Sequence, residues 1–519
     1  MKSVGIIDFG GQYTHLIARR CRNLGFRSVV IPFFSDIDNE IEKENIGAII
    51  ISGGPRSVDE DEKFIEIVKK ILEKAKKGIP VLGICFGHQL IAYIMGGKVE
   101  KRFKSEFGET KINVLTNDVL FDGVPKLFTA WMSHNDTVTS LPDGLIVLAV
   151  SENNVIASYR HEELPIYGVQ FHPEVAHTEY GLDILRNFLS NIAGLKSSWN
   201  PTSVIEKIID EIKTNYPTGN ALVAVSGGVD SITTAVVMLR ALGPDRVHVL
   251  FIDTGLMREG EADFVKKALV EMGFKNIHLI DASQRFINAL KGVSDPEEKR
   301  RVIAEKFREV FEEALKSLEK EYGKFVLFGQ GTIYPDRIES GKAGAGSTKI
   351  KSHHNVVMES LRGVTMIEPL ADFYKDEVRK IAIYLGVPSR IVVRHPFPGP
   401  GLAVRILGEI DEIKLGIIRK ATRILEEILM EEGIYDKLWQ AFPVLLPVKS
   451  VGVKGDSRAY GYIISIRAVE SVDAMTASFA KLPWDLLSKI ANRIVSEIPE
   501  VVRVVYDITN KPPATIEYE

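Results

Sequence analysis

Two alternations of short apolar runs with longer amphipathic runs constrain the fold of this chain more than any other feature. In the first, the β-branched runs "SVGIID", "SVVIPF", "GAIIIS" and "PVLGI" predict buried strands, and "QYTHLIARRCRNLG" and "EKFIEIVKKILEKAKKG" predict helices. Strands that alternate with helices indicate a mostly parallel sheet with helices on its faces. We therefore predict a doubly wound α/β domain over residues 1–193.

The second alternation follows a break at residues 193–203 that is rich in Ser, Gly and Pro. Its runs "ALVAV", "RVHVLFID" and "NIHLID" predict strands, and the charged amphipathic stretch over residues 296–322 predicts a long helix. These features indicate a second doubly wound α/β domain, over residues 203–393. Within it, residues 335–352 are rich in Gly, Ser and Lys and have no apolar period, which predicts a long mobile loop and a candidate lid.

The last part of the sequence, residues 394–519, begins with the proline- and glycine-rich stretch "RHPFPGPG". A helical pattern over residues 412–433 follows, and then alternating strands such as "YGYIISIRAV" and "VVRVVYDI". This pattern predicts a smaller α+β domain. A division into several domains also fits the length, because 519 residues are too many for a single hydrophobic core.

Composition narrows the class of protein. Apolar residues make up 45% and charged residues 26%, as in ordinary globular proteins, and the net charge of −4 argues against a general affinity for nucleic acids. The two cysteines are too few for a disulfide framework and lack the spacing of zinc ligands, which indicates a reducing compartment. No apolar run approaches the ~18 residues of a membrane span. Because Asp8 interrupts the apolar start, we expect no signal peptide and a cytoplasmic protein without membrane partners.

Cys85 stands in "VLGICFGHQL", where a predicted buried strand passes through Gly-x-Cys-x-Gly into a helix. This is the layout of a nucleophile elbow, in which small neighbours allow a sharp turn and close passage of the backbone. The start of a helix also favours the thiolate form of a cysteine. The alternative is a buried cysteine that fills a small gap, and the spacing alone does not decide between the two. Cys21 has no comparable setting and is expected to be structural.

A thiolate nucleophile needs a base, and the base needs an orienting partner. The predicted strand "IYGVQF" is followed by His172 and, two residues later, by Glu174. Residues two apart in an extended segment point to the same side, so this carboxylate can reach the imidazole. Gly53 and Gly54 follow the strand "AIII" and can offer backbone N–H groups to an oxyanion. Taken singly, each feature also fits an ordinary strand end or glycine turn.

Together these residues resemble the class I glutamine amidotransferases over the first domain. The resemblance implies that Cys85 attacks the side-chain amide of glutamine, that His172 protonates the leaving ammonia and that Glu174 orients His172. Water would then release glutamate. It also implies an oxyanion hole lined by the backbone N–H groups of Gly54 and Phe86.

The second alternation opens with "ALVAVSGGVDSITTAVVML", in which a strand leads through a Ser- and Gly-rich turn into a helix. Such a turn at the start of a helix forms an anion cradle of backbone N–H groups, and the lack of Gly-Lys-Ser/Thr excludes a Walker A loop. A turn with a purely structural role would not need two glycines, two serines and an aspartate within six positions. The loop consists of Ser226, Gly227, Gly228, Val229, Asp230 and Ser231.

This loop resembles the pyrophosphate-binding loop of the ATP pyrophosphatases, which implies cleavage of ATP between its α- and β-phosphates and an adenylylated intermediate. The resemblance makes Asp230 a ligand of Mg²⁺, a hard cation that prefers carboxylate oxygens. Asp253 ends the next predicted strand and is expected at the same sheet edge, where doubly wound sheets bind their ligands. Lys375, in "FYKDEVRK", can neutralise phosphate charge, although it also fits a solvated helix residue.

The whole chain, in this domain order, resembles the glutamine-hydrolysing GMP synthases. The stretches that carry the resemblance are "GQGTIYPDRIES", "KIKSHHNV", "HPFPGPGLAVR", "VLLPVKSVGVKGDSRAYGY" and "RVVYDITNKPPATIEYE". It implies that ATP activates the C2 oxygen of XMP as adenyl-XMP, with release of pyrophosphate, and that ammonia then displaces AMP to form GMP. The positions that match XMP contacts are Arg300, Lys511 and Glu517, although Arg300 also fits a solvated helix face.

The resemblance further implies a homodimer formed through the third domain. The sequence departs from the family at Tyr518, where tryptophan is expected, and in a Gly- and Ala-rich stretch at residues 341–346. The first departure removes no reactive group. The second leaves the length and mobility of the lid open.

Three other functions compete with this interpretation. Another glutamine-dependent ATP pyrophosphatase, such as an NAD or asparagine synthetase, would not need the "HPFPGPG" and "KPPATIEYE" stretches. A tRNA-modifying sulfur transferase predicts a basic face and paired reactive cysteines, which the charge and the cysteine count oppose. A nucleotide-binding regulator without catalysis would tolerate loss of Cys85, His172 or Asp230, and all three are present.

Overall fold

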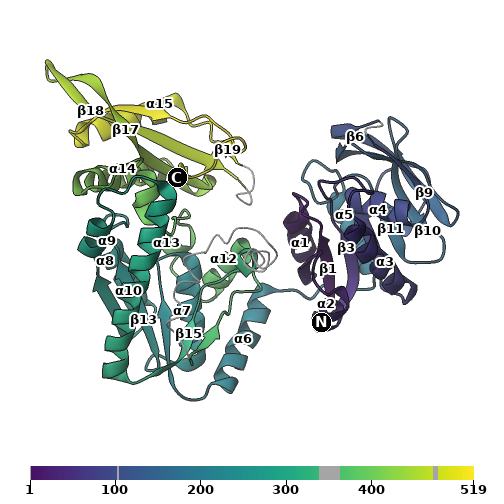
Figure 1. The fold of residues 1–519 in the computed structure, drawn as a ribbon, viewed down its shortest axis with the longest axis horizontal. Helices are drawn as coiled ribbons and strands as arrows, with labels where there is room; N and C mark the ends of the chain where they lie inside the picture. Colours follow the sequence, from purple (N-terminus) through teal and green to yellow (C-terminus); the bar gives the residue numbers. More distant parts are fainter. Residues whose placement is uncertain (1, 102–103, 338–362, 472–476) are drawn as a thin grey trace. The chain divides into compact units, whose positions relative to one another are not determined.

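The computed structural model describes residues 2–101, 104–337, 363–471 and 477–519 (Figure 1). Most of the predicted loop at residues 335–352, including its Gly- and Ala-rich stretch, lies outside these residues. The chain divides into two compact units, Met1–Asn200 and Pro201–Glu519. The boundary proposed at residue 394, inside the second unit, stays a prediction.

The first unit is built on a sheet in which nine described strands run in the order β2-β1-β3-β4-β11-β10-β9-β6-β7. Its first five strands are parallel and fully or largely buried, which is why their sequences are continuous apolar runs. These strands are β1 (Ser3–Asp8), β2 (Ser28–Pro32), β3 (Ile46–Ile51), β4 (Val81–Ile84) and β11 (Ile166–Val169). The helices of this unit are α1 (Thr14–Asn23), α2 (Ile37–Lys43), α3 (Glu62–Lys76), α4 (Phe86–Ile94) and α5 (Gly181–Arg186), with a π-helical turn η2 (Asn187–Ile192).

The other four strands of this sheet are antiparallel. They are β6 (Glu106–Val114), β7 (Leu127–His134), β9 (Leu145–Ser151) and β10 (Ile156–His161), and a separate pair is formed by β5 (Lys98–Glu100) and β8 (Thr137–Ser140). A short 3-10 turn, η1 (Val119–Phe121), connects β6 and β7. The antiparallel half brings the end of β7 beside the cysteine that follows β4, because Cys85 Sγ contacts the carbonyl of Ser133 at 3.6 Å.

The second unit contains a sheet of five described parallel strands in the order β14-β13-β12-β15-β16. They are β12 (Asn220–Ala224), β13 (Val247–Asp253), β14 (Asn276–Asp281), β15 (Phe325–Gly329) and β16 (Thr365–Ile367). The chain adds β13 and β14 on one side of β12 and then β15 and β16 on the other. Doubly wound sheets bind ligands beyond the strand ends at such a reversal, which here falls between β12 and β15.

Helices cover this parallel sheet. Helices α6, α7 and α12 pack together on one side, and α9 and α10 lie on the other (Figure 1). The described helices are α6 (Pro201–Asn215), α7 (Val229–Leu242), α8 (Glu261–Glu271), α9 (Ser283–Ala289), α10 (Pro296–Tyr322), α12 (Lys375–Tyr384) and α13 (Ser389–Val392).

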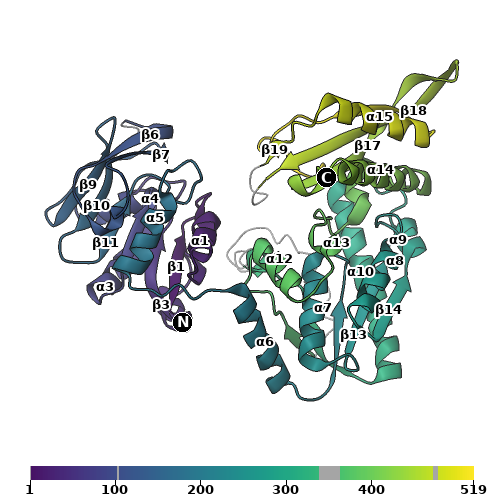
Figure 2. The same ribbon diagram turned by 180° about the vertical axis from the view of Figure 1, so that it is seen from behind.

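The C-terminal part of the second unit pairs two long strands, β17 (Gln440–Lys454) and β18 (Ser457–Glu470), into a hairpin whose tip extends past α15 (Figure 2). The remaining elements are η6 (Gly401–Arg405), α14 (Glu412–Glu431), η7 (Tyr435–Lys437), β19 (Ser478–Phe479), α15 (Trp484–Glu497) and β20 (Val501–Tyr506). One apolar core runs from Phe311 of α10 through Ile418 of α14 to Ile490 of α15, so this part packs continuously onto the parallel sheet. Together with the first unit, this arrangement confirms the predicted fold class.

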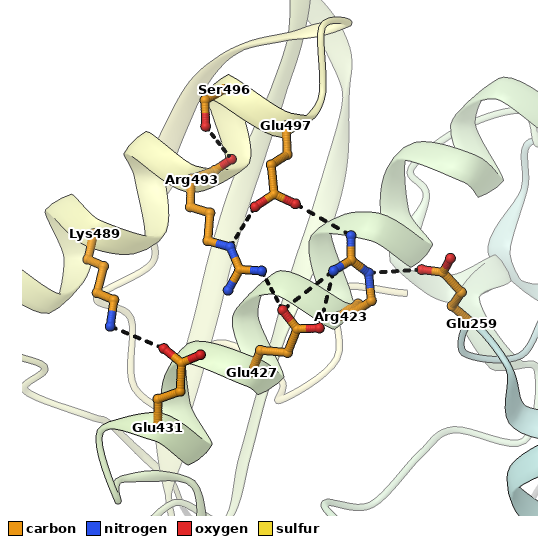
Figure 3. Close-up of polar contacts among 8 residues, drawn as sticks. All are labelled: Glu259, Arg423, Glu427, Glu431, Lys489, Arg493, Ser496 and Glu497. Atoms are coloured by element: carbon orange, nitrogen blue, oxygen red, sulfur yellow. Dashed lines mark hydrogen bonds and ion pairs between the residues drawn. The ribbon is translucent and has the colours of Figure 1, made fainter.

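An ion-pair network joins the exposed sides of α14 and α15 (Figure 3). Arg493 contacts Glu427 at 2.5 Å and Glu497 at 2.6 Å, and Arg423 contacts Glu427 at 3.1 Å and Glu497 at 3.5 Å. Two arginines and two glutamates thus form a closed ring. Arg423 extends the network at 3.1 Å to Glu259 in the segment before α8.

Among the described residues, no helix is long and apolar enough to cross a membrane.

Candidate active sites

Cys85 forms the turn between β4 and α4, with a φ of 53° that non-glycine residues rarely adopt. The small residues on either side are required by close backbone packing. A Cβ on Gly83 would lie 2.6 Å from the carbonyl of Gly87, and a Cβ on Gly87 would lie 2.4 Å from the carbonyl oxygen of Ile51. Cys85 therefore has the strained geometry of a nucleophile elbow at the start of a helix.

His172 and Glu174 lie just after β11, which is the neighbour of β4 in the sheet. The Nδ1 atom of His172 is 2.7 Å from Oε1 of Glu174, and both side chains are buried. Because a carboxylate only accepts hydrogen bonds, Nδ1 carries the proton of this contact. The backbone carbonyls of the pair are also held, by Thr178 Oγ1 at 2.6 Å and by Arg20 Nε at 2.9 Å.

Electrostatics favour the charged form of this histidine. Burial lowers the pKa of His172, but the Glu174 carboxylate and the Cys85 side chain outweigh it and hold the pKa well above its ordinary value. The structure thus brings together Cys85, His172 and Glu174, the residues predicted as nucleophile, base and orienting carboxylate.

A cavity of about 210 Å³ opens at Cys85. The two residues predicted for the oxyanion hole, Gly54 and Phe86, both line it, and a Cβ on Gly54 would lie 2.8 Å from the Phe86 ring. The structure therefore places both residues beside the nucleophile. The other lining residues are Pro55, Arg56, Ser57, Gln89, Phe107, Ser133, His134, Asn135 and Asp136.

Sequence reasoning missed the wall of this cavity that follows β7. His134 is buried there, with Nε2 at 3.1 Å from Glu106 and Nδ1 at 2.9 Å from the carbonyl of Asp136. Burial opposes ionisation of Glu106, but hydrogen bonds from His134, Ser151 and Asn153 hold its pKa below the usual range. Gln89 fixes the same wall by donating to Asp136 O at 2.7 Å. The sequence signal for Gln89 was its place one turn after Cys85, next to His88, in a helix whose later residues are apolar.

Cys21 is fully buried in α1, and burial raises the pKa of its thiol to about 12. It lies away from the cavity lining, as expected for a structural residue.

The Ser- and Gly-rich loop of the second unit connects β12 to α7 at the point where the strand order reverses. Ser231 Oγ accepts from Ser226 N at 3.1 Å and donates to Gly228 O at 3.1 Å, which closes the loop on itself. Gly227 has a φ of 81°, and a Cβ there would lie 2.8 Å from Glu261 Oε1. The loop is therefore preshaped at a helix start, where backbone N–H groups attract anions.

Asp230 and Lys375 lie together at this loop, since Lys375 Nζ donates to Oδ2 of Asp230. The other carboxylate oxygen, Oδ1, is buried and has no hydrogen-bond partner within the described part of the chain. Asp253 ends β13, beside β12, and accepts from Gly255 N at 2.8 Å. All three predicted residues thus lie at the same end of the sheet or contact the loop there.

The free oxygen of Asp230 fits a divalent cation. No cluster of three or more potential metal-binding side chains occurs among the described residues. A magnesium site at Asp230 would therefore draw its other ligands from nucleotide phosphates and water, as Mg²⁺ commonly does.

The residues matched to XMP contacts lie around the last residues of the sequence. Arg300 of α10 donates to the main-chain oxygen of Glu519 at 2.6 Å, so it is not simply a solvated helix residue. Glu517 accepts from Arg405 and Gln440. Lys511 pairs its backbone with that of Ala477, just before β19.

Tyr518 stands where the family resemblance predicts tryptophan, and its hydroxyl makes two polar contacts. It donates to Asp507 Oδ2 at 2.8 Å and lies 3.0 Å from Ser465 Oγ. The hydroxyl of Tyr518 thus joins the last residues of the sequence to β18 and to the residue that follows β20.

Comparisons with known proteins match two parts of the chain to family models and the whole chain to curated relatives. Residues 5–192 match the family model "Glutamine amidotransferase class-I", and residues 427–518 match "GMP synthase C terminal domain". Over its whole length the chain is 47% identical to a GMP synthase [glutamine-hydrolyzing] of Petrotoga mobilis and 50% identical to one of Pyrobaculum aerophilum, and covers 100% of each. A third relative with that description, from Aquifex aeolicus, is 48% identical, with 99% of each chain covered.

Proposed function

The chain belongs to the glutamine-hydrolysing GMP synthase family, and we propose that Cys85 and the loop at residues 226–231 divide its reaction between two sites. The enzyme makes GMP with glutamine as the source of nitrogen. One site releases ammonia from glutamine, and the other activates XMP with ATP. The observation that carries this division is the pairing of a complete Cys-His-Glu arrangement in one unit with a preshaped anion loop in the other.

At the first site, the Cys85 thiolate attacks the side-chain carbonyl carbon of glutamine. The developing oxyanion lies against the backbone N–H groups of Gly54 and Phe86, which line the same cavity. His172 gives its proton to the nitrogen of the tetrahedral adduct, the C–N bond breaks, and ammonia departs, which leaves a glutamyl thioester on Cys85. Water, deprotonated by His172, then releases glutamate, while Glu174 keeps Nδ1 of the ring protonated throughout.

At the second site, the backbone of residues 226–231 holds the phosphates of ATP, with Lys375 and Asp253 at the same sheet end. The C2 oxygen of XMP attacks the α-phosphorus, and pyrophosphate leaves. Ammonia then attacks C2 and displaces AMP, which gives GMP. Asp230 would hold Mg²⁺ through its unpartnered Oδ1, and the cation would offset phosphate charge when ATP is bound.

XMP lies, in this proposal, against the C-terminal part of the second unit. Arg300 and Lys511 supply positive charge for the nucleotide phosphate, and Glu517 supplies a carboxylate that accepts from the N–H groups of the base. In support of this, Arg300 donates to the main-chain oxygen of Glu519, two residues after Glu517. We further propose that the protein is cytoplasmic and that it forms a homodimer through residues 394–519. Sedimentation of the purified protein would test whether it is a dimer.

The deciding experiment measures AMP release from ATP by the purified protein with Mg²⁺ and ammonium, with and without XMP. XMP-dependent AMP release supports both the ATP chemistry and the acceptor. If AMP release does not depend on XMP but does depend on another acceptor, that acceptor, and not XMP, is the substrate. Absence of AMP release with every acceptor would contradict the second site as a whole.

A further inference from the structure

The last residues of the sequence are tied to the second unit by two buried cations, Arg405 and Lys299, to which the sequence analysis gave no role. Arg405, at the end of η6, is 1% exposed and faces the carboxylate of Glu517 with two of its nitrogens. The Nε atom is 3.1 Å from Oε2, and Nη2 is 2.8 Å from Oε1. This is the paired geometry in which a guanidinium fixes both the position and the plane of a carboxylate.

Two aromatic rings pack against the buried side chain of Arg405. Its guanidinium lies 4.2 Å from the ring centroid of Phe442 and 5.1 Å from that of Phe397. Phe397 belongs to the stretch "HPFPGPG", whose prolines limit the backbone around it. Gln440 adds a third donor to the carboxylate, at 2.7 Å from Oε1 of Glu517, and also donates to Pro396 O at 3.0 Å.

A second buried cation, Lys299, ties the same segments together. Its Nζ donates to Ala403 O at 3.2 Å, to Ile406 O at 2.7 Å and to a carboxylate oxygen of Glu519 at 2.5 Å. An ammonium has three donors, and all three are used. Lys299 therefore links α10 to the segment that carries Arg405 and to the residue two positions beyond Glu517.

The carboxylate of Glu517 remains available on one side. Its side chain is 20% exposed, whereas that of Arg405 is 2% exposed. Oε1 accepts two hydrogen bonds and Oε2 accepts one, so one of roughly four acceptor positions of the carboxylate is left, on Oε2. A planar base with ring N–H groups, such as xanthine, supplies the donor that this position lacks.

We propose that Arg405, supported by Lys299, is a positioning residue for XMP: it acts through Glu517 by fixing the carboxylate plane that receives the base. The inference rests on the proposed contact of Glu517 with XMP. A purely structural role for Arg405 would predict lower stability without selective weakening of one substrate. A positioning role predicts a higher KM for XMP, an unchanged KM for ATP, and dependence of the effect on the Glu517 charge.

The test is a double-mutant cycle on ammonium-dependent GMP formation with Arg405→Met, Glu517→Gln and the double variant. Arg405→Met is expected to raise the KM for XMP about tenfold or more while leaving the KM for ATP within about twofold. In the Glu517→Gln background the same substitution is expected to add little, because the carboxylate it orients is gone. Arg301→Met, which removes an exposed arginine next to Arg300, is the control and is expected to leave both KM values unchanged.

The outcomes separate this inference from the function on which it rests. An unchanged KM for XMP in Glu517→Gln would overturn the proposed contact of Glu517. Two outcomes would overturn the positioning role alone. One is a KM for XMP that rises in Glu517→Gln but not in a folded Arg405 variant. The other is a double variant in which the effects of the two substitutions on the KM for XMP simply add. If Arg405→Met does not fold, Arg405→Lys takes its place in the cycle. Lysine keeps the buried positive charge but cannot make the paired contact with the carboxylate of Glu517. This variant is expected to raise the KM for XMP severalfold.

Discussion

Lys375, the first residue of α12, donates a hydrogen bond to Asp230, which lies 145 residues earlier in the first turn of α7. The contact occupies Oδ2 of the carboxylate and leaves the buried Oδ1 without a partner among the described residues. A buried carboxylate oxygen without a donor is costly unless a ligand completes it. The pair therefore places a carboxylate with one unpartnered oxygen and an ammonium group beside the loop of residues 226–231.

Replacement of Asp230 by Asn is expected to lower the kcat of ammonium-dependent GMP formation by at least about 100-fold, because the charge that would hold Mg²⁺ near the phosphates is lost. The measurement is initial rate against Mg²⁺ concentration at saturating ATP and XMP. Asp245→Asn, in the segment between α7 and β13 and exposed, is the control and should behave as the wild type. Full activity of Asp230→Asn at ordinary Mg²⁺ would contradict the role proposed for this carboxylate.

Replacement of Cys85 by Ala is expected to abolish glutamine-dependent GMP formation, with a loss of at least about 1,000-fold, and to spare formation from ammonium salts. The reason is that the elbow and the phosphate loop belong to different compact units. Rates with each nitrogen source, measured on the same preparation, give the comparison. Cys21→Ala is the matched control: it should keep both activities and only lower stability, since Cys21 fills space on the buried face of α1. Equal loss of both activities in folded Cys85→Ala would refute the division.

Replacement of Glu174 by Gln tests the charge that acts on His172. The pKa of His172 is raised by Glu174 and Cys85 despite burial, so the ring stays protonated to a higher pH than an ordinary histidine. Activity that needs this proton is present below the raised pKa and is lost as the pH rises through it. Without the Glu174 charge the pKa of His172 falls, so the alkaline limb of kcat/KM for glutamine should move to lower pH.

The control for this pH profile is Glu179→Gln, which removes an exposed carboxylate from the same segment. The ammonium-dependent rate at each pH corrects for changes at the second site. An alkaline limb that stays in place in Glu174→Gln would show that this carboxylate does not set the charge of His172.

Local sequence patterns predicted the parallel strands and the elbow for identifiable reasons. Strands buried on both faces are continuous apolar runs, so β1 and β13 lie where "SVGIID" and "RVHVLFID" predict them. The glycines around Cys85 also had a local cause, because neighbouring backbone excludes a Cβ at both positions. The long charged helix α10 begins with Asp295 as its cap and Pro296 in its first turn, which are local start signals.

The antiparallel strands of the first unit and the buried cations of the second were not predicted. The strand β6 alternates buried with exposed residues and carries charges on its exposed side, so its run is less apolar than those of the parallel strands. Lys299 lies in a highly charged stretch, and nothing local distinguishes it from its solvated neighbours. Its carboxylate partner is 220 residues away in the chain, so only the tertiary structure shows that it is buried and paired.

The ion-pair ring between α14 and α15 offers a test of stability independent of catalysis (Figure 3). Arg493 binds Glu427 and Glu497 at once, so Arg493→Met removes two contacts and leaves two carboxylates beside each other. Exposed pairs contribute little singly, but networks contribute more as temperature rises, because the cost of removing charges from water falls. We expect a loss of about 1 kcal/mol or less in the free energy of unfolding.

Thermal unfolding of Arg493→Met, at low and at high salt, checks this prediction. The variant should unfold at a lower temperature than the wild type at low salt, and the difference should shrink in 1 M salt, where roughly 3 Å of screening length remains. Lys420→Met, an exposed lysine on α14, is the control and should cause no such salt-dependent difference. A deficit in Arg493→Met that does not change with salt would mean that the arginine stabilises the helix pair by packing of its aliphatic part, because screening acts on charges and leaves apolar contacts in place.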